Sequence, residues 1–224
     1  VPDASVELQV VYEDDDVLFI NKQPGQVVHP GAGREQGTVA AGLVARFPEI
    51  AQLAADGYGD PFRPGIVHRL DKGTSGLLVV ARTPLAFDSL SAQMKEHDAT
   101  RIYLGLVDGH VQEERGLIDA PLGRSSATPT MMAVRSDGRP ARTHYEVIAR
   151  LESPATTLLR LILDTGRTHQ IRVHVKAIGH PIVNDRRYGH RRDKRLDEDR
   201  FFLHATALEV THPRTGEQIG RAHV

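Results

Sequence analysis

Short apolar runs and alternating positions predict that strands dominate the chain. The expected strands cover residues 17–20, 76–82, 101–107, 142–150, 157–164 and 201–210. In the third of these, Ile102, Leu104 and Leu106 share one face, and Tyr103 lies on the other, less apolar face. Because the strands outnumber the helices and arrive in hairpin-like runs, we expect an α+β fold with a mixed, largely antiparallel central sheet flanked by helices and loops.

Three helices are expected between these strands. Thr38 can cap a helix that runs to about Arg46, and Pro84 can open a second, longer one. Thr168 can cap a third, short helix that Gly179 ends. The apolar positions of this short helix recur at the spacing of one helical face and are Ile171, Val175 and Ile178. The charged stretch 185–200 is expected to be a loop.

The composition excludes several kinds of site. The chain has no cysteine, which rules out disulfides, thiolate nucleophiles and zinc–thiolate centres and permits the reducing cytoplasm where we expect the protein to work. No apolar run approaches the roughly 18 to 20 residues needed to cross a bilayer, so we expect no membrane partner.

Charge is unevenly distributed along the chain, although the total is only −1. Residues 1–62 hold 3 Lys and Arg against 10 Asp and Glu, whereas residues 63–195 hold 22 against 14. The basic middle section can present a phosphate-binding face that the total hides. A solvated surface with uneven charge explains the same pattern, so charge alone leaves RNA or DNA binding open.

Polar residues interrupt apolar structure in three segments. The first, His68 to Gly76, combines a carboxylate with two cations, two hydroxyls and two glycines directly before a strand. Glycines there let the backbone turn sharply and a ligand approach closely. The second is Arg101-Ile102-Tyr103, and the third is Thr165 to Arg172. Taken singly, each has a structural explanation: a salt-bridged turn, a half-buried strand tyrosine and a helix-surface cation.

Together these segments resemble the motifs of the RluA-type pseudouridine synthases. His68-Arg69-Leu70-Asp71 with residues 74–79 is similar to the family's signature motif, and Arg101-Ile102-Tyr103 to its tyrosine strand. Thr165 to His174 is similar to the family's Thr-Gly-Arg-Thr-His-Gln-Ile-Arg-Val-His element. Further matches are Asn21-Lys22 with residues 27–33, Pro181-Ile182 with Asp185 and Tyr188-Gly189, and Leu203-His204-Ala205. Several ordered motifs at family-like spacing are far more specific than one short pattern.

The resemblance implies an isomerase that converts uridine in RNA to pseudouridine without a cofactor or a metal ion. It makes the carboxylate of Asp71 the nucleophile. It makes Arg172 the cation that keeps this carboxylate ionised through a bidentate pair. Tyr103 is implied to stack on the uracil, with its phenol near the departing C5 proton. His169 and His174 are five positions apart and off one helical face, which does not support a zinc pair.

The resemblance also implies a set of residues that bind the substrate or the rest of the RNA, namely Arg69, Lys72, Arg167, His169, Gln170, Ile171 and Leu203. Arg69 is expected to fill the gap left by a flipped-out uridine. Lys72 and Arg167 are expected to hold phosphates, and Ile171 and Leu203 to wall the base pocket. A second basic set can hold phosphates or be a solvated run of charge: Arg186, Arg187, Arg191, Arg192, Lys194 and Arg195.

The target and two rival functions stay open at this point. The motif order and the His29 to Gly33 run look closest to the RluD-like members, which act on large-subunit (23S-type) ribosomal RNA, and transfer RNA is the alternative. A non-catalytic RNA-binding module explains the basic section but not the place of Asp71 between Arg69 and Lys72. A glycoside hydrolase needs a second carboxylate roughly 5 to 10 Å from the first, and no partner is recognisable near the motifs.

The extent of the catalytic part is also predicted. We expect residues 1–218 to form one catalytic domain without a preceding S4-like RNA-binding domain, and residues 219–224 to be an artefactual tail. We expect a monomer. One departure from the family pattern is Gln23, which stands between Lys22 and Pro24 where the family usually reads Lys-Pro.

Overall fold

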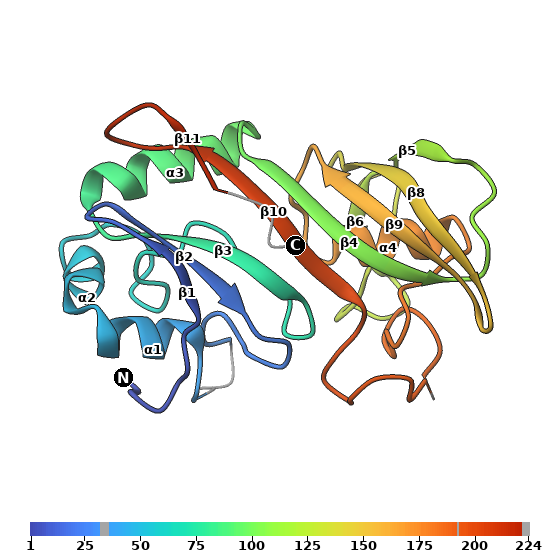
Figure 1. The fold of residues 1–224 in the computed structure, drawn as a ribbon, viewed down its shortest axis with the longest axis horizontal. Helices are drawn as coiled ribbons and strands as arrows, with labels where there is room; N and C mark the ends of the chain where they lie inside the picture. Colours follow the sequence, from blue (N-terminus) through green and yellow to red (C-terminus); the bar gives the residue numbers. More distant parts are fainter. Residues whose placement is uncertain (32–35, 192, 221–224) are drawn as a thin grey trace. The chain divides into compact units, whose positions relative to one another are not determined.

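The computed structural model describes residues 1–31, 36–191 and 193–220 (Figure 1). The chain folds into two compact units. Unit 1 comprises Val1–Thr100 with Ala205–Val224, and unit 2 comprises Arg101–His204. No helix in the described ranges is long and apolar enough to cross a bilayer. Some residues used in the sequence predictions lie outside the described ranges: Ala32, Gly33, Arg192 and Arg221 to Val224.

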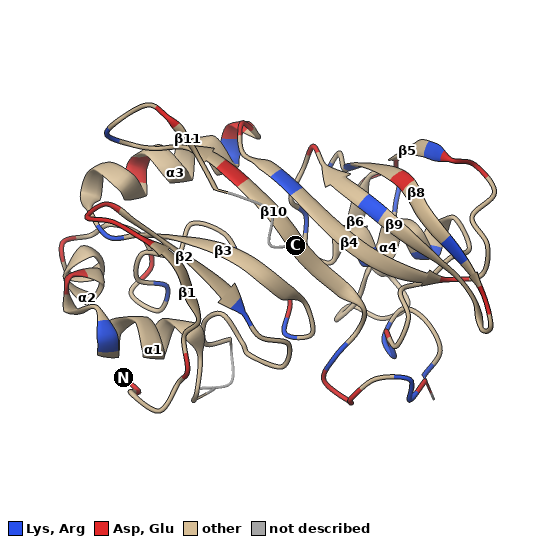
Figure 2. Cartoon of the chain, viewed as in Figure 1, with Lys and Arg blue, Asp and Glu red and all other residues tan. Residues whose placement is uncertain are grey.

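The two units differ in charge. Unit 2 contains 18 Lys and Arg against 13 Asp and Glu, a balance of +5, whereas unit 1 contains 10 against 16, a balance of −6. Figure 2 shows Lys and Arg positions on strands β4, β8 and β9, all of which belong to the basic unit. The basic middle section found in the sequence therefore falls mainly in unit 2.

The sheet of unit 1 has the strand order β1-β2-β3-β10. Its strands are β1 (Val10–Glu13), β2 (Val17–Lys22), β3 (Ser75–Ala81) and β10 (Leu203–Thr211), and β11 (Gln218–Ile219) pairs with the end of β10. β2 and β3 are antiparallel, from Val17 opposite Ala81 to Lys22 opposite Gly76. The three strands predicted here are confirmed, whereas β1 and β11 were missed because they are short and partly exposed. β11 includes Ile219, the first residue of the predicted tail.

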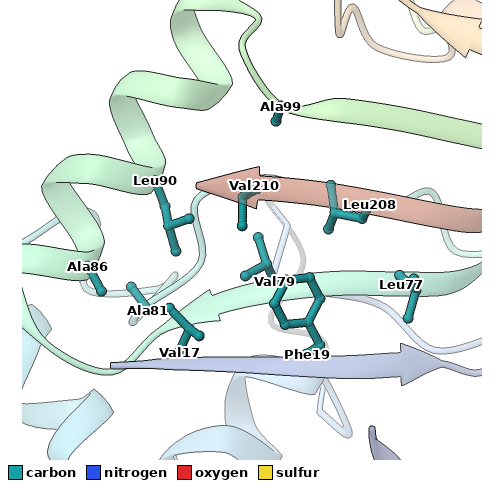
Figure 3. Packing of buried hydrophobic residues seen from close by; sticks show 10 residues of the cluster. All are labelled: Val17, Phe19, Leu77, Val79, Ala81, Ala86, Leu90, Ala99, Leu208 and Val210. Atoms are coloured by element: carbon teal, nitrogen blue, oxygen red, sulfur yellow. The ribbon is translucent and has the colours of Figure 1, made fainter. Parts of the chain in front are cut away.

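A hydrophobic core of unit 1 lies between α3 (Pro84–Glu96) and its sheet (Figure 3). Alternate strand positions face this core because successive side chains point to opposite faces of a sheet. The buried residues are Val17, Phe19, Leu77, Val79, Ala81, Ala86, Leu90, Ala99, Leu208 and Val210. α3 begins as predicted, with Pro84 in its first turn and the Thr83 hydroxyl accepting the Ala86 N–H.

Two further helices of unit 1 follow each other directly. α1 (Val39–Arg46) begins after Thr38, whose hydroxyl accepts the N–H of Ala41, as predicted. α2 (Pro48–Ala55) was not predicted, and only Ile50 and Leu53 are buried along it. Two apolar positions three residues apart are too few to give a helical period in the sequence.

Unit 2 contains a second group of strands in the order β4-β9-β8-β5. These are β4 (Thr100–Asp108), β5 (Arg115–Asp119), β8 (Arg142–Glu152) and β9 (Ala155–Leu163), accompanied by the small hairpin of β6 (Leu122–Arg124) and β7 (Met132–Val134) and by α4 (Gln170–Ala177). The pairs β4–β9, β9–β8 and β8–β5 are antiparallel. The predicted α+β class with a mixed, largely antiparallel sheet is therefore confirmed.

Two local features of unit 2 add to or differ from the predictions. The two faces of β4 alternate as predicted, and the less apolar face, which carries Arg101, Tyr103 and Gly105, is the more buried one. A Cβ atom at Gly105 would lie 2.9 Å from the Leu161 side chain, which shows how closely neighbouring elements cover this face. The cap of α4 is different from the prediction: the helix begins after His169, which has φ 56° and forms no side-chain cap, and not after Thr168.

Candidate active site

The segment that carries Asp71 leads directly into β3 of unit 1. Leu70 is buried, Asp71 is half-buried, and Arg69 and Lys72 are exposed. The segment is fixed to β3 upstream, because the Val79 N–H donates a 3.0 Å hydrogen bond to Nε2 of His68. His68 and Leu70 therefore anchor the segment, while the cations Arg69 and Lys72 are exposed on either side of the half-buried Asp71.

A buried ammonium fixes the same segment from the other side. Lys22, at the end of β2, is only 1% exposed. Its Nζ donates to the carbonyl oxygens of Gln23 and Gln26 at 2.9 Å and of Lys72 at 3.1 Å. The Gly25 N–H donates to the same Lys72 oxygen at 2.8 Å. Burial lowers the pKa of Lys22 to about 8, and the negative charge of Asp71 opposes that shift.

This role of Lys22 was not predicted from the sequence. In the sequence, Lys22 stands out only as part of a motif match. Its three acceptors are main-chain carbonyls, and no residue type in the sequence indicates that they bind an ammonium. All three N–H groups of the ammonium are used, which is how a lysine is accommodated in an interior. The main chain immediately after Asp71 is therefore tied to the end of β2.

Close backbone packing explains the glycine that follows the Asp71 segment. Gly76 has φ +110°, which side chains of L-residues rarely adopt. A Cβ atom there would lie 2.6 Å from the nitrogen of Ala205 and against its carbonyl oxygen. The start of β3 can approach β10 only because residue 76 has no side chain.

In unit 2, Arg172 of α4 is held by a buried carboxylate. Its Nε and Nη2 donate to the two oxygens of Asp185 at 2.7 and 3.0 Å. The guanidinium also lies over the rings of Tyr188, at 4.8 Å, and Phe201, at 4.4 Å. The predicted pairing of Arg172 with Asp71 stays a prediction, and the bidentate pair with Asp185 is a finding that the sequence did not reveal.

Asp185 is itself oriented by the main chain. Its Oδ1 accepts the N–H groups of Arg187 and Tyr188, both at 3.1 Å. The Tyr188 hydroxyl accepts the Met132 N–H at 3.0 Å and lies 2.7 Å from Nδ1 of His169. This network fixes the guanidinium of Arg172 in position and direction, and it also holds the predicted RNA-binding residue His169 at the start of α4.

Gln170 serves the turn before α4. Its amide donates to the Arg142 carbonyl and the Thr143 hydroxyl, and its oxygen accepts from the Thr165 hydroxyl and the Arg167 N–H. The residue is 3% exposed. These four bonds use its whole hydrogen-bonding capacity. Gln170 thus holds the Thr165 to Arg167 turn, a role that was not predicted, and RNA binding by Gln170 stays a prediction.

The predicted base-binding side chains are buried or nearly so. Tyr103 on β4, Ile171 on α4 and Leu203 at the start of β10 all lie in unit 2 and are less than one-tenth exposed. The Leu203 side chain approaches Gly105, two positions after Tyr103 on the same face of β4, because a Cβ there would lie 3.4 Å from Leu203 Cδ1. Leu203 and the tyrosine face of β4 are thus brought together.

The basic loop between α4 and β10 is partly neutralised within the chain. Arg195 pairs with Asp193 and, at 2.7 Å, with Asp108. Arg186 donates to the Asp193 carbonyl and pairs with Glu198 at 3.1 Å. Figure 2 shows Lys and Arg positions interspersed with Asp and Glu along this loop. These pairs favour the interpretation of a solvated charge run for Arg186 and Arg195.

The predicted site residues are distributed over both units. Unit 1 contains Arg69, Asp71 and Lys72, and unit 2 contains Tyr103, Arg167, His169, Gln170, Ile171, Arg172 and Leu203. Arg167, half-buried at the turn, donates from Nε to the Pro140 carbonyl at 3.0 Å. Over the described part of the chain, no group of three or more His, Asp or Glu side chains is arranged to hold a metal ion.

Comparison with known proteins agrees with these motifs. The family described as RNA pseudouridylate synthase matches residues 16–177. An uncharacterised RNA pseudouridine synthase of Bacillus subtilis is 44% identical over 96% of this chain and 68% of its own length. The ribosomal large subunit pseudouridine synthase D of Nitrosomonas europaea is 43% identical over 95% of this chain and 60% of its own length. This chain thus spans between about three-fifths and two-thirds of these relatives.

A solved structure shows the same likeness. The human RNA pseudouridylate synthase domain containing 1 covers 100% of this chain, and 86% of that protein is covered in turn, with a TM-score of 0.78 and 31% sequence identity. The match extends through both the Asp71 segment and the elements of unit 2. The chain belongs to the RNA pseudouridylate synthase family.

Proposed function

We propose that this protein is an RNA pseudouridine synthase that isomerises specific uridines, with the carboxylate of Asp71 as its nucleophile. The observation that carries the proposal is the anchoring of the Asp71 segment. The buried ammonium of Lys22 binds the Lys72 carbonyl one residue beyond Asp71, and its charge acts on that carboxylate. A carboxylate on a segment anchored in this way, with a cation acting on it, suits covalent attack on a positioned nucleotide.

The chemistry needs no oxidant, reductant or activated group. The C1′–N1 bond of uridine breaks, the base turns, and C1′ joins C5, while the proton on C5 leaves and N1 gains one. Asp71 attacks the sugar or the base and is released at the end. The target must be flipped out of folded RNA at a cost of a few kcal/mol, and Arg69, exposed on the Asp71 segment, is proposed to fill the gap.

Residues of unit 2 are proposed to bind the flipped nucleotide. Tyr103 stacks on the uracil, and Ile171 and Leu203 wall the base. Arg172 provides the positive charge that keeps Asp71 ionised, and its fixed direction in the cage of Asp185, Tyr188 and Phe201 supports this role. Arg167, together with Lys72 of unit 1, holds phosphates. His169 and Gln170 maintain the turn from which Arg167 projects.

Large-subunit ribosomal RNA is the proposed target. The support is the name of relatives such as the ribosomal large subunit pseudouridine synthase D of Haemophilus influenzae, which is 42% identical over 96% of this chain. We further propose that the protein acts in the cytoplasm as a monomer, that residues 1–218 form its catalytic domain, and that it requires no metal ion.

Release of tritium from RNA that carries C5-labelled uridine tests the proposal. The wild-type protein should release tritium from a large-subunit ribosomal RNA fragment and leave pseudouridine in the product. Asp71→Asn should abolish release while RNA affinity stays within a few-fold. Asp88→Asn, an exposed carboxylate on α3, is the matched control and should keep full activity.

Three results would contradict the assignment. Pseudouridine formation by Asp71→Asn would remove the nucleophile from the proposal. Tight RNA binding by the wild-type protein without any tritium release would favour the non-catalytic module. Liberation of free uracil would indicate a glycoside hydrolase.

A further inference from the structure

Arg101, the first residue of unit 2, is a buried cation that lacks an ion pair within the described ranges. Its side chain projects from β4 on the same face as Tyr103, and the residue is only 8% exposed. Its Nε and Nη2 atoms are buried and have no hydrogen-bond partner among the described residues. Burying a charge that is not paired costs several kcal/mol, and an anion that met the guanidinium would offset this cost.

The turn before α4 is shaped around this side chain. A Cβ atom on Gly166 would lie 2.5 Å from Nη1 of Arg101 and 3.6 Å from its Cζ. Glycine at position 166 therefore lets the main chain of the turn lie against the guanidinium without displacing the end of the arginine side chain. The hydrogen bonds of Gln170 hold the turn in this position. The guanidinium of Arg101 and the main chain at Gly166 thus lie against each other, and we call this pair the cradle.

The charges around the cradle also favour an anion. Burial, assisted by the neighbouring charge of Arg167, lowers the pKa of Arg101, whereas Tyr103 and Asp164 act in the opposite direction. Asp164 is already engaged at 3.0 Å with Nε2 of His144 and at 3.7 Å with Nε of Arg142. Two arginines therefore act on this position, and the nearby carboxylate is shared with His144 and Arg142.

The unpartnered atoms have the geometry of a phosphate-binding edge. Nε and Nη2 form one side of the planar guanidinium, the side that donates two parallel hydrogen bonds to a pair of oxygens. Residues 101 and 103 are two positions apart on a strand, roughly 7 Å along the chain. This span is on the scale of one nucleotide, so a base at Tyr103 would leave its own phosphate near Arg101.

We infer that Arg101, seated against Gly166, is the binding site for one phosphodiester of the substrate RNA, adjacent to the target uridine. This inference rests on the proposed function and adds a phosphate contact to it. The two phosphate oxygens supply the acceptors that Nε and Nη2 lack, and the contact fixes the backbone of the nucleotide whose base lies at Tyr103.

Neutralising single phosphates tests the inference directly. The substrates are unmodified RNA and two RNAs with one uncharged methylphosphonate, placed 5′ or 3′ of the target uridine. Wild-type kcat/KM for tritium release should fall about tenfold to a hundredfold with one of the two methylphosphonate RNAs, compared with unmodified RNA. Arg101→Gln should show a similar loss on unmodified RNA and no further loss with that methylphosphonate. It should also show a salt dependence of kcat/KM less steep by about 0.7 in the log–log slope.

Arg160→Gln is the matched control, because Arg160 lies on β9 of the same unit and pairs with Glu146 at 3.6 Å on a half-exposed face. It should respond to the methylphosphonates as the wild-type protein does. If Arg101→Gln does not fold, Arg101→Lys keeps the charge but not the two-donor edge, and it should lose most of the methylphosphonate effect.

Results that contradict this phosphate contact can be distinguished from results that contradict the proposed function. An unchanged wild-type kcat/KM with both methylphosphonate RNAs would overturn the phosphate contact, whatever the variants do. The contact would also be overturned if the methylphosphonate lowered kcat/KM of Arg101→Gln by the same factor as it lowers that of the wild-type protein. Either result would leave pseudouridine formation itself intact. Absence of tritium release from unmodified RNA would instead overturn the proposed function and this inference with it.

Discussion

Replacement of Lys22 by methionine tests how the Asp71 segment is held. Methionine matches the length of the side chain and removes the ammonium, whose three hydrogen bonds end on Gln23, Gln26 and Lys72. The Lys72 carbonyl keeps its bond from the Gly25 N–H, whereas the other two carbonyls lose their short bonds. The variant therefore removes both the anchor beyond Asp71 and a positive charge that acts on its carboxylate.

Two opposing terms set the change in stability. Each buried carbonyl left without its partner costs about 1–3 kcal/mol. Burial lowers the pKa of Lys22 to about 8 from 10.5, which corresponds to about 3 kcal/mol against the charged form at neutral pH. Because methionine avoids that second cost, we expect a net change within about 2 kcal/mol, or a few degrees in Tm. Avoiding the cost of the buried charge does not restore activity, because Asp71 is still misplaced. We therefore expect kcat/KM to fall about a hundredfold.

Urea denaturation and tritium release measure the two effects on the same samples, with Lys95→Met on the exposed end of α3 as control. The pKa of Lys22 is lower in the folded protein than in the unfolded chain, so its burial becomes less costly as pH rises from about 8 toward 10.5. The free energy of unfolding of wild type relative to Lys22→Met should therefore rise by about 2.5 kcal/mol between pH 7 and pH 10. A variant with wild-type kcat/KM, or no such pH dependence, would refute the reasoning.

Further variants probe the parts of the site separately. Arg172→Ala should cripple turnover by removing the charge proposed to keep Asp71 ionised; turnover within tenfold of wild type would contradict that role. Asp185→Asn, which keeps an oxygen acceptor for Arg172 but not the charge, should lower kcat/KM by about tenfold, less than Arg172→Ala does, with exposed Asp137→Asn as control. Gly76→Ala should lower the free energy of unfolding by about 2 kcal/mol or more in urea titrations, because its φ and the Ala205 backbone both oppose a side chain; an unchanged midpoint would refute this.

The regular elements with strong local signals were predictable. The apolar runs of β2 and β3 lie where the pattern predicted strands, and α1 and α3 begin where Thr38 and Pro84 predicted a helix start. β5, β6 and β7 were missed because they are short and their burial alternates with too few apolar residues to stand out. Local sequence determines a boundary only where enough residues contribute to it.

Which face of β4 is buried could not be predicted from residue types. The alternation was predicted correctly, whereas burial of the face with Arg101 and Tyr103 depends on side chains from other elements, such as Leu161. The sequence likewise identified Arg172 and Asp185 in separate motifs but not their pairing, because their separation of thirteen positions crosses the end of α4 and a turn. Such pairs depend on tertiary packing, which one sequence without its fold does not reveal.

Main-chain groups hold the charged residues in both parts of the site. Three carbonyls bind the ammonium of Lys22, and two backbone N–H groups bind the carboxylate of Asp185. The path of the main chain around such charged residues therefore matters more than which residue types supply the carbonyl and N–H groups. This distinction bears on Gln23, the position where the family usually has proline.

Gln23 contributes its carbonyl to Lys22, and a proline at that position would keep that carbonyl. The substitution would remove the exposed Gln23 N–H bond to the Gln26 side chain, 3.1 Å, and the side-chain bonds to Gln9, 2.9 Å, and to the Asn21 carbonyl, 3.4 Å. Lys22 precedes it in a strand, which is compatible with a following proline. Gln23→Pro should therefore keep kcat/KM within about threefold and stability within about 1 kcal/mol. A tenfold loss of activity in this variant, alongside an unchanged Tm, would show that the Gln23 side chain itself shapes the Asp71 segment.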